Sequence, residues 1–241
     1  LVGVLYESGA QKFDAVHATG AKQLAELAVE AGITNFVQMS AIGADADSSS
    51  DYARSKAAGE TAVLEAIPTA TIMRPSIIFG PEDQFFNRFA AMARLSPALP
   101  LIGGGETKYQ PVYVKDVAAA MTAALQQPEW NGKVLELGGP EVATFAELME
   151  LTLKEIGRSR PLVKLPSFVA KAIASVLQIL PAPLLTVDQV ELLKHDNVVS
   201  EGALGLSDLG IEPSAMSAVL PAYLYRFRRT GQFADGTTSG T

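Results

Sequence analysis

Tyr52 and Lys56 are the residues whose types and spacing most clearly suggest chemistry. They lie four positions apart in the segment SSSDYARSKAAGE. That spacing is about one helical turn, so the phenol and the ammonium are expected on one helix face. A nearby cation favours the phenolate, so the pair predicts a lowered pKa for Tyr52 and a role in proton transfer during carbonyl reduction or alcohol oxidation. The same spacing also arises by chance on helix surfaces.

The surrounding segments alternate between strand and helix patterns. Strands are predicted at 1–6, 33–40 and 69–80, and helices from 13 to 32 and after an N-cap at Ser50 or Asp51. Strands that alternate with helices and carry few charges predict a parallel sheet covered on both faces. Ligands of such folds bind at the carboxyl ends of the strands. Ser40, Tyr52 and the turn at 74–76 all fall at or just beyond predicted strand ends.

The order of these motifs resembles a known family. A strand ending in Ser40, a Tyr-x-x-x-Lys helix and then RPSIIFGPED is similar to the extended short-chain dehydrogenase/reductases, which include the NAD-dependent epimerases and dehydratases. The run LIGGGETKYQPVYVKDVAAAM matches the family's passage into the substrate half, with Val114 and Asp116 as matching residues. The resemblance covers roughly residues 1–145. It implies a Rossmann-type, doubly wound parallel sheet that binds NAD(H) or NADP(H).

The sequences of segments 48–60 and 74–93 resemble one atypical branch of this family more closely. This branch contains the dehydrogenase-like accessory subunit of respiratory complex I and its bacterial relatives. The resemblance implies a tightly held nucleotide with a mainly structural role, and subunits of the hydrophilic arm as partners. It also implies a peripheral location on the cytoplasmic face of a bacterial inner membrane or the matrix face of the mitochondrial one.

The resemblance also implies the residues of the site. Tyr52 and Lys56 would form the catalytic pair, and Lys56 would hold the nicotinamide ribose. The implied cofactor-binding residues are Val2, Gly3, Ser40, Tyr52, Lys56, Pro75 and Ser76. Pro75 and Ser76 could instead be only a strand end turned by proline, and Val2 and Gly3 only strand residues.

Two departures from the family pattern bear on function. No glycine-rich phosphate loop of the G-x-G-x-x-G type occurs. Leu1 matches a position within the family's fourth strand, so we expect an N-terminal part of the Rossmann domain to be missing from this chain. The other departure is Ile42, which stands where active members usually have a Ser or Thr that donates a hydrogen bond to the substrate. An isoleucine cannot donate one, which argues against classical turnover.

Two functions of different class follow. One is a nucleotide-binding, non-catalytic accessory or assembly subunit of respiratory complex I. The alternative is an active NAD(P)-dependent oxidoreductase or epimerase/dehydratase acting on a nucleotide-sugar-like substrate. Ile42 favours the first, and the intact Tyr52–Lys56 pair favours the second.

The domain organisation is expected to be bipartite. Residues 1–80 and 110–140 are assigned to the remaining Rossmann domain, and 81–109 and 141–230 to a smaller α+β substrate-type or docking domain. Residues 231–241 are expected to form a flexible tail. Segment 167–180 is strongly apolar, which predicts either a core-facing helix or a surface that docks on a partner or rests at a membrane edge.

Composition excludes several function classes. The 241-residue chain is 48% hydrophobic, carries a net charge of −7 and contains no cysteine. The charge argues against nucleic acid as a partner. The lack of cysteine excludes disulfides and thiolate chemistry. His17 and His195 have no neighbouring ligands at metal spacing, so no metal site is predicted.

Overall fold

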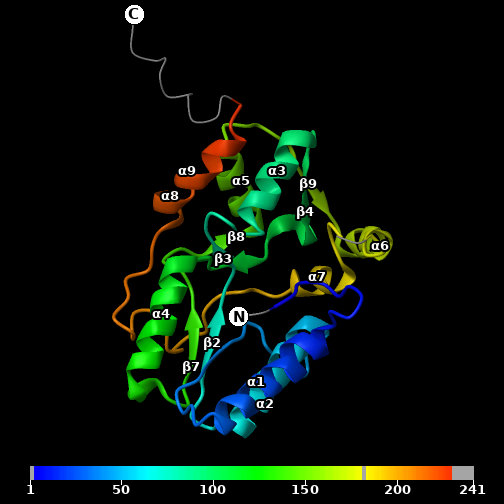
Figure 1. Ribbon diagram of the computed structural model, residues 1–241. Coiled ribbons are helices and arrows are strands. Elements are labelled where there is room, and N and C mark those ends of the chain that lie inside the picture. Colours follow the sequence, from blue (N-terminus) through cyan, green and yellow to red (C-terminus); the bar gives the residue numbers. More distant parts are fainter. Residues whose placement is uncertain (1–2, 181–182, 230–241) are drawn as a thin grey trace, which may run out of the picture.

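The computed structural model describes residues 3–180 and 183–229 (Figure 1). Its longer helices are η1 (Asp14–Thr19), α1 (Gly20–Glu30), α2 (Asp51–Ala66), α3 (Phe86–Leu95), α4 (Val114–Gln126), α5 (Phe145–Glu155), α6 (Ser167–Leu177) and α7 (Val187–Leu192). Shorter helical turns are η2 (Gly103–Gly105), η3 (Pro128–Trp130), α8 (Met216–Val219), α9 (Pro221–Leu224) and η4 (Tyr225–Phe227). The strands are β1 (Val37–Met39), β2 (Thr71–Pro75), β3 (Ile78–Phe79), β4 (Leu99–Ile102), β5 (Lys108–Tyr109), β6 (Val112–Tyr113), β7 (Val134–Leu137), β8 (Ala143–Thr144) and β9 (Leu162–Leu165).

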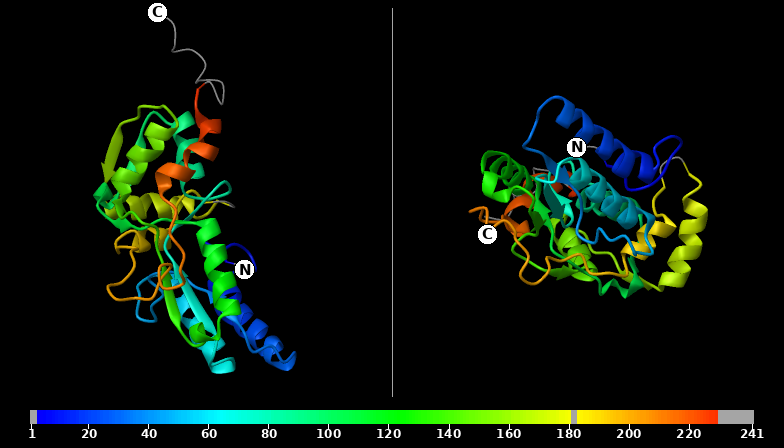
Figure 2. Two further views of the ribbon diagram at one scale, coloured as in Figure 1. Left: turned by 90° about the vertical axis from the view of Figure 1, so that its left-hand side faces the viewer. Right: turned by 90° about the horizontal axis from the view of Figure 1, so that it is seen from below.

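A parallel sheet of order β1-β2-β7 forms the first part of the molecule. Helix α4 packs on β2 and β7 through Val117 and Ala120, which join a buried cluster with Met73 and Leu135. Helices α1 and α2 lie together on the other side of the sheet (Figure 1 and Figure 2, right), with a small apolar cluster between them. The prediction of a parallel sheet covered on both faces is therefore confirmed.

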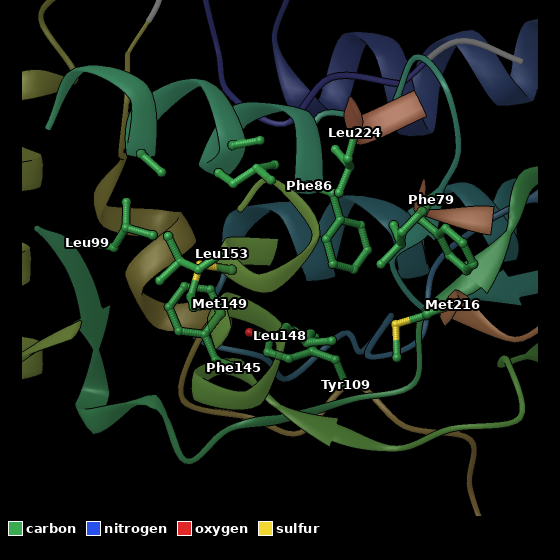
Figure 3. Close-up of a cluster of buried hydrophobic side chains, with 14 of the residues drawn as sticks. Phe79, Phe86, Leu99, Tyr109, Phe145, Leu148, Met149, Leu153, Met216 and Leu224 are labelled. Carbon is green, nitrogen blue, oxygen red and sulfur yellow. The ribbon is translucent and has the colours of Figure 1, made fainter. Parts of the chain in front are cut away.

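A second apolar core lies at the other end of the molecule, where α3, α5 and α9 pack beside β4 (Figure 1). Phe86, Leu99, Phe145 and Leu148 are buried there, and Figure 3 shows their side chains together. Small two-stranded sheets accompany these helices, with β4–β9 parallel and β5–β8 antiparallel. This part has the mixed α+β character expected from the sequence.

The chain crosses between the two parts more often than the predicted domain boundaries suggest. Leu206 and Leu209 are buried in the cluster of β2, β7 and α4. Leu204 forms a parallel bridge with Leu135 of β7. Residues 204–211 therefore pack on the first sheet, although the sequence assigned them to the second domain. The domain division itself stays a prediction.

Local sequence signals mark the ends of several helices. Ser50 caps α2 by accepting a hydrogen bond from the backbone of Ala53, 3.2 Å away. Thr144 and Glu147 form a capping box at α5. Gly32 follows α1 with a φ of 72°, a conformation that glycine adopts without strain.

The predicted strand at 1–6 is not seen among its described residues, which form bends and irregular backbone. Its amide at Val4 instead donates to the ring of His17. A strand needs a neighbour to satisfy its backbone groups, and residues 3–6 pair with none of the described strands. Val2 and the predicted tail 231–241 lie outside the described residues.

Candidate functional site

The carboxyl ends of β1 and β2 bring several of the predicted residues to one edge of the sheet. Beyond β1, the amide of Ser40 donates to the carbonyl of Met73 at 2.6 Å, and that of Ile42 to the carbonyl of Pro75 at 3.0 Å. The parallel ladder thus continues past the strand. Because of this pairing, Ser40 and Pro75 lie on adjacent segments, at the strand ends where parallel sheets bind ligands.

Helix α2 places Tyr52 and Lys56 beside this edge. The Lys56 Nζ lies 5.8 Å from the centre of the Tyr52 ring, so the predicted proximity is confirmed. The same Nζ donates to the carbonyl of Met39 at 3.4 Å, which ties the lysine to the end of β1. A methyl group on Gly3 would lie 3.9 Å from the Lys56 Nζ, so Gly3 also borders the site.

The predicted pKa of Tyr52 was wrong in direction. Burial disfavours the phenolate and, together with the Asp188 carboxylate, raises the pKa of Tyr52 to about 12. Burial also lowers the pKa of Lys56 from its ordinary value. Within residues 3–180 and 183–229, no group hydrogen-bonds the Tyr52 hydroxyl, so nothing there assists its ionisation.

His17 is a buried residue of the site, although the sequence indicated only that it does not ligate a metal. Its Nε2 accepts a hydrogen bond from the amide of Val4 at 3.0 Å, and its Nδ1 lies 2.9 Å from Ser55 Oγ. That hydroxyl donates to the carbonyl of Tyr52 at 2.7 Å, so the proton between His17 and Ser55 belongs to Nδ1. These contacts select the neutral imidazole. Burial and the Lys56 charge agree, lowering the pKa of His17 to about 4.

An ion pair holds α2 against the sheet behind the site. Arg74 of β2 donates from Nε and Nη2 to the two carboxylate oxygens of Glu60, at 2.8 and 2.6 Å. Glu60 is buried, and Glu136 of β7 lies 4.0 Å from the guanidinium. This bidentate geometry fixes the rotation of α2 relative to β2, and with it the direction in which Lys56 points.

Ser40 carries an unsatisfied polar atom. Its Oγ is the one buried side-chain oxygen or nitrogen that lacks a hydrogen-bond partner in the described part of the chain. Leaving such a group unpaired costs about 1–3 kcal/mol. A hydroxyl left free at the carboxyl end of a parallel strand, beside a lysine, fits the polar edge of a bound nucleotide.

Asn197 joins the strand ends to the C-terminal half and was also missed by the sequence. Its Nδ2 donates to the carbonyl of Ile42 at 3.0 Å, and its Oδ1 lies 2.7 Å from Ser76 Oγ. The Ser76 hydroxyl is therefore satisfied within the protein. The side chain of Ile42, at the position where the resemblance expects a hydroxyl donor, is buried.

Asp188 is a further residue without a local sequence signal. Its carboxylate accepts hydrogen bonds from Ser50 Oγ and from the amides of Asp51 and Tyr52, at 2.9, 2.6 and 3.3 Å. Because these partners are more than 130 positions away, only the folded chain brings them together.

A cleft of about 630 Å³ opens near the N-terminal segment and α3. It is lined by Tyr6, Pro81, Glu82, Asp83, Gln84, Asn87, Arg88, Pro183, Leu184 and Arg226. The guanidinium of Arg88 already donates to the carbonyls of Pro183 and Leu184, and that of Arg226 to Asn87. Both cations are thus used in holding the chain together, and Glu82 and Asp83 lie beside them.

Within the described residues, no group of three or more His, Asp or Glu side chains is placed to ligate a metal ion. None of the described helices has the length and apolarity to cross a bilayer.

The fold and the site define a class. The model of the NAD dependent epimerase/dehydratase family matches residues 5–138, and the chain belongs to that family. A dTDP-glucose 4,6-dehydratase from Streptomyces venezuelae, solved with NAD and TYD bound, has a similar fold. The TM-score is 0.67 at 19% identity, covering 93% of this chain and 71% of that one. The Rossmann-type fold expected from the sequence is thereby confirmed.

Similarity to curated proteins is more specific than the match to the family. The chain is 40% identical to NADH dehydrogenase [ubiquinone] 1 alpha subcomplex subunit 9 of Arabidopsis thaliana, over 99% of this chain and 62% of the relative. It is 32% identical to the NADH-ubiquinone oxidoreductase 40 kDa subunit of Neurospora crassa, over 97% of this chain and 61% of the relative. Both relatives are named as subunits of a ubiquinone-linked NADH dehydrogenase or oxidoreductase, so the resemblance predicted from the motifs is confirmed. The chain spans about three fifths of their length.

Proposed function

We propose that this chain belongs to an NAD(P)(H)-binding, non-catalytic accessory subunit of a respiratory NADH–quinone oxidoreductase, complex I. The observation that carries the proposal is the likeness to named complex I subunits along 99% of the chain. Ile42 supports it, since a buried apolar side chain occupies the position of the usual hydroxyl donor.

The nucleotide, NADP(H) or NAD(H), is bound at the carboxyl ends of β1 and β2. Lys56 donates to the ribose hydroxyls of the nicotinamide side, and the unpaired Ser40 Oγ gains its missing partner. Gly3 lies along the nucleotide. Pro75 and Ser76 contribute backbone and van der Waals contact, because the Ser76 hydroxyl is already bound to Asn197.

The bound nucleotide stabilises the fold and performs no turnover. In active relatives a nicotinamide group exchanges a hydride with substrate, which requires a tyrosine that exchanges a proton near neutral pH. A Tyr52 pKa of about 12 opposes that role. A ligand held well above its dissociation constant stabilises the folded state by several kcal/mol, and this linkage is the contribution we assign to it.

The outer face of α6 is the proposed docking surface. Phe168 and Val176 are 75% and 68% exposed, and Ile179, just beyond the helix, is 82% exposed. The inner face packs on α7 through Ala170 and Ala174. An exposed apolar stripe of this kind fits a protein interface. The partner on this surface is a subunit of the hydrophilic arm. The protein that contains this chain lies peripherally on the cytoplasmic or matrix face of the inner membrane.

Co-purification tests the proposal. The intact protein, tagged in its native host, is recovered from gently solubilised membranes, and its companions and nucleotide content are measured. Recovery of NADH–quinone oxidoreductase subunits in stoichiometric amounts, with about one NAD(P)(H) per chain, is expected. A soluble, solitary protein would contradict the accessory role.

A working oxidoreductase or epimerase/dehydratase is the second candidate. The retained Tyr52–Lys56 pair favours it. Turnover of a nucleotide sugar or another hydroxyl substrate by the purified protein would support this candidate. If Ile42→Ser, which restores a hydroxyl donor, creates no activity either, the enzyme reading loses its basis.

A further inference from the structure

Asp188 connects the C-terminal half of the chain to the helix that carries the site. It lies in the first turn of α7, and both its carboxylate oxygens face the N-terminus of α2. Oδ1 accepts from the amide of Asp51 at 2.6 Å, and Oδ2 accepts from Ser50 Oγ at 2.9 Å and from the amide of Tyr52 at 3.3 Å.

These contacts hold the part of α2 that matters for the nucleotide. The first amides of a helix have no partner inside the helix, and a carboxylate there also complements the helix dipole. Tyr52 is itself one of the donors, and Lys56 follows one turn later. A displacement of the α2 N-terminus therefore moves both side chains relative to Ser40.

Helix α7 also contacts α6 and the N-terminal segment. Val190 is buried with Ala170 and Ala174 of α6, and Glu191 forms an ion pair with Lys171 of α6. The neighbouring Gln189 donates to the carbonyl of Leu5 at 3.3 Å, two residues after Gly3. One short helix thus touches α2, the segment beside Lys56 and the helix with the exposed apolar face (Figure 1).

We propose that Asp188 is a positioning residue of the nucleotide site and couples it to the α6–α7 segment. This inference rests on the proposed function, because it concerns the same nucleotide. A nucleotide that favours the state with Asp188 bound to α2 also stabilises α6 and α7. The nucleotide therefore raises the affinity of α6 for its partner. By reciprocity, a partner bound on α6 raises the affinity for the nucleotide by the same factor.

The test measures nucleotide affinity and hydrogen exchange on the intact protein. NADH and NADPH are titrated by fluorescence into the wild type, Asp188→Asn and Asp188→Glu, and exchange of peptides covering 167–192 is followed with and without nucleotide. In the wild type, nucleotide is expected to slow exchange in α7 at least threefold. Asp188→Asn is expected to raise the dissociation constant about tenfold and to abolish that protection, and Asp188→Glu to restore part of both.

Asp208→Asn is the matched control. Asp208 also accepts a backbone hydrogen bond, from Gly205 at 2.8 Å, but within a local turn away from α2. This variant is expected to bind and exchange like the wild type. A merely structural role for Asp188 would lower overall stability without changing which peptides the nucleotide protects.

The outcomes distinguish a failure of the proposed nucleotide binding from a failure of the coupling through Asp188. If the wild type binds neither nucleotide, the proposed function fails and this inference fails with it. If the wild type binds but its α6 and α7 peptides exchange equally with and without nucleotide, the coupling alone is overturned, even should Asp188→Asn fail to fold. Unchanged affinity and protection in a folded Asp188→Asn protein would overturn it too.

Discussion

The ring of His17 lies edge-on against the ring of Tyr52, with centroids 5.3 Å apart and planes at 86°. Phe13 packs on both rings, at 5.6 and 5.8 Å. The neutral imidazole is therefore a packing partner of the tyrosine as well as the acceptor for Val4. Charging this ring would place a second cation near Lys56 and against the ring of Phe13, so acid is expected to disturb this packing.

The stability of the protein is expected to fall between pH 6.5 and 4 through His17. The folded state keeps His17 neutral down to its pKa of about 4, whereas the unfolded chain takes up the proton near 6.5. Below pH 6.5 the unfolded state thus binds more protons, so acid favours it, by roughly 2–3 kcal/mol over the whole window. Below pH 4 this group contributes no further loss. Urea unfolding at several pH values measures the effect.

The matched comparison uses two variants. His17→Phe keeps an aromatic ring but cannot titrate, so its stability should depend less steeply on pH than that of the wild type. His195→Gln changes a histidine exposed on the surface and should keep the wild-type slope. Equal slopes for the wild type and His17→Phe would refute the assignment.

Lys56→Met is predicted to weaken nucleotide binding by about 10- to 100-fold. A hydrogen bond from a charged donor contributes roughly 1.5–3 kcal/mol, and the methionine keeps the aliphatic contacts of the stem. Titration of NADPH by fluorescence measures the change. Lys22→Met is the control, because Lys22 lies exposed on α1 beside Glu26. Equal affinity in the wild type and Lys56→Met would remove the lysine from the site.

Glu60→Gln should destabilise the protein by about 3 kcal/mol, since removing one partner of a buried ion pair leaves the other charge uncompensated. The Arg74 guanidinium still lies 4.0 Å from the Glu136 carboxylate in this variant, which limits the loss of stability. Urea denaturation gives the value. In the surface pair of Lys22 and Glu26, the change Glu26→Gln should cost less than about 0.5 kcal/mol. Similar costs for both variants would mean that the Glu60 pair adds nothing special.

Several features were predictable because their causes are local. Ser50, Thr144 with Glu147, and Gly32 mark helix ends through contacts within a few residues, and Ser50 is one of the two N-caps that the sequence predicted for α2. The Tyr52–Lys56 spacing likewise fixed their proximity. Each of these signals involves only one helix and its ends.

The errors have a common physical origin in contacts distant along the chain. The Tyr52 pKa was predicted from Lys56 alone, whereas burial and the Asp188 carboxylate determine it. Asp188 and Asn197 reach the site from more than 120 positions away, and no local pattern distinguishes them from other polar residues. The segment at 3–6 has the composition of a strand but no strand partner among the described residues.

The paired change Phe168→Ser and Val176→Ser is predicted to abolish co-purification with complex I subunits while leaving the fold intact. Both side chains are exposed, so their replacement should change unfolding free energy by less than about 0.5 kcal/mol each. Leu95→Ser is the control, since Leu95 is 92% exposed at the end of α3, away from α6. Retained co-purification would exclude α6 as the docking surface. Loss of binding to liposomes, with subunit binding kept, would assign the face to a membrane edge instead.

The central claim is that the nucleotide serves structure and Tyr52 performs no chemistry. It is tested most directly by replacing the chromosomal gene with Tyr52→Phe or Lys56→Met and measuring assembled NADH–quinone oxidoreductase in the membranes. The account predicts wild-type levels and activity with Tyr52→Phe, and at least a severalfold loss of assembled enzyme with Lys56→Met. Loss of function in Tyr52→Phe, with assembly and bound nucleotide unchanged, would contradict the account and establish a catalytic tyrosine.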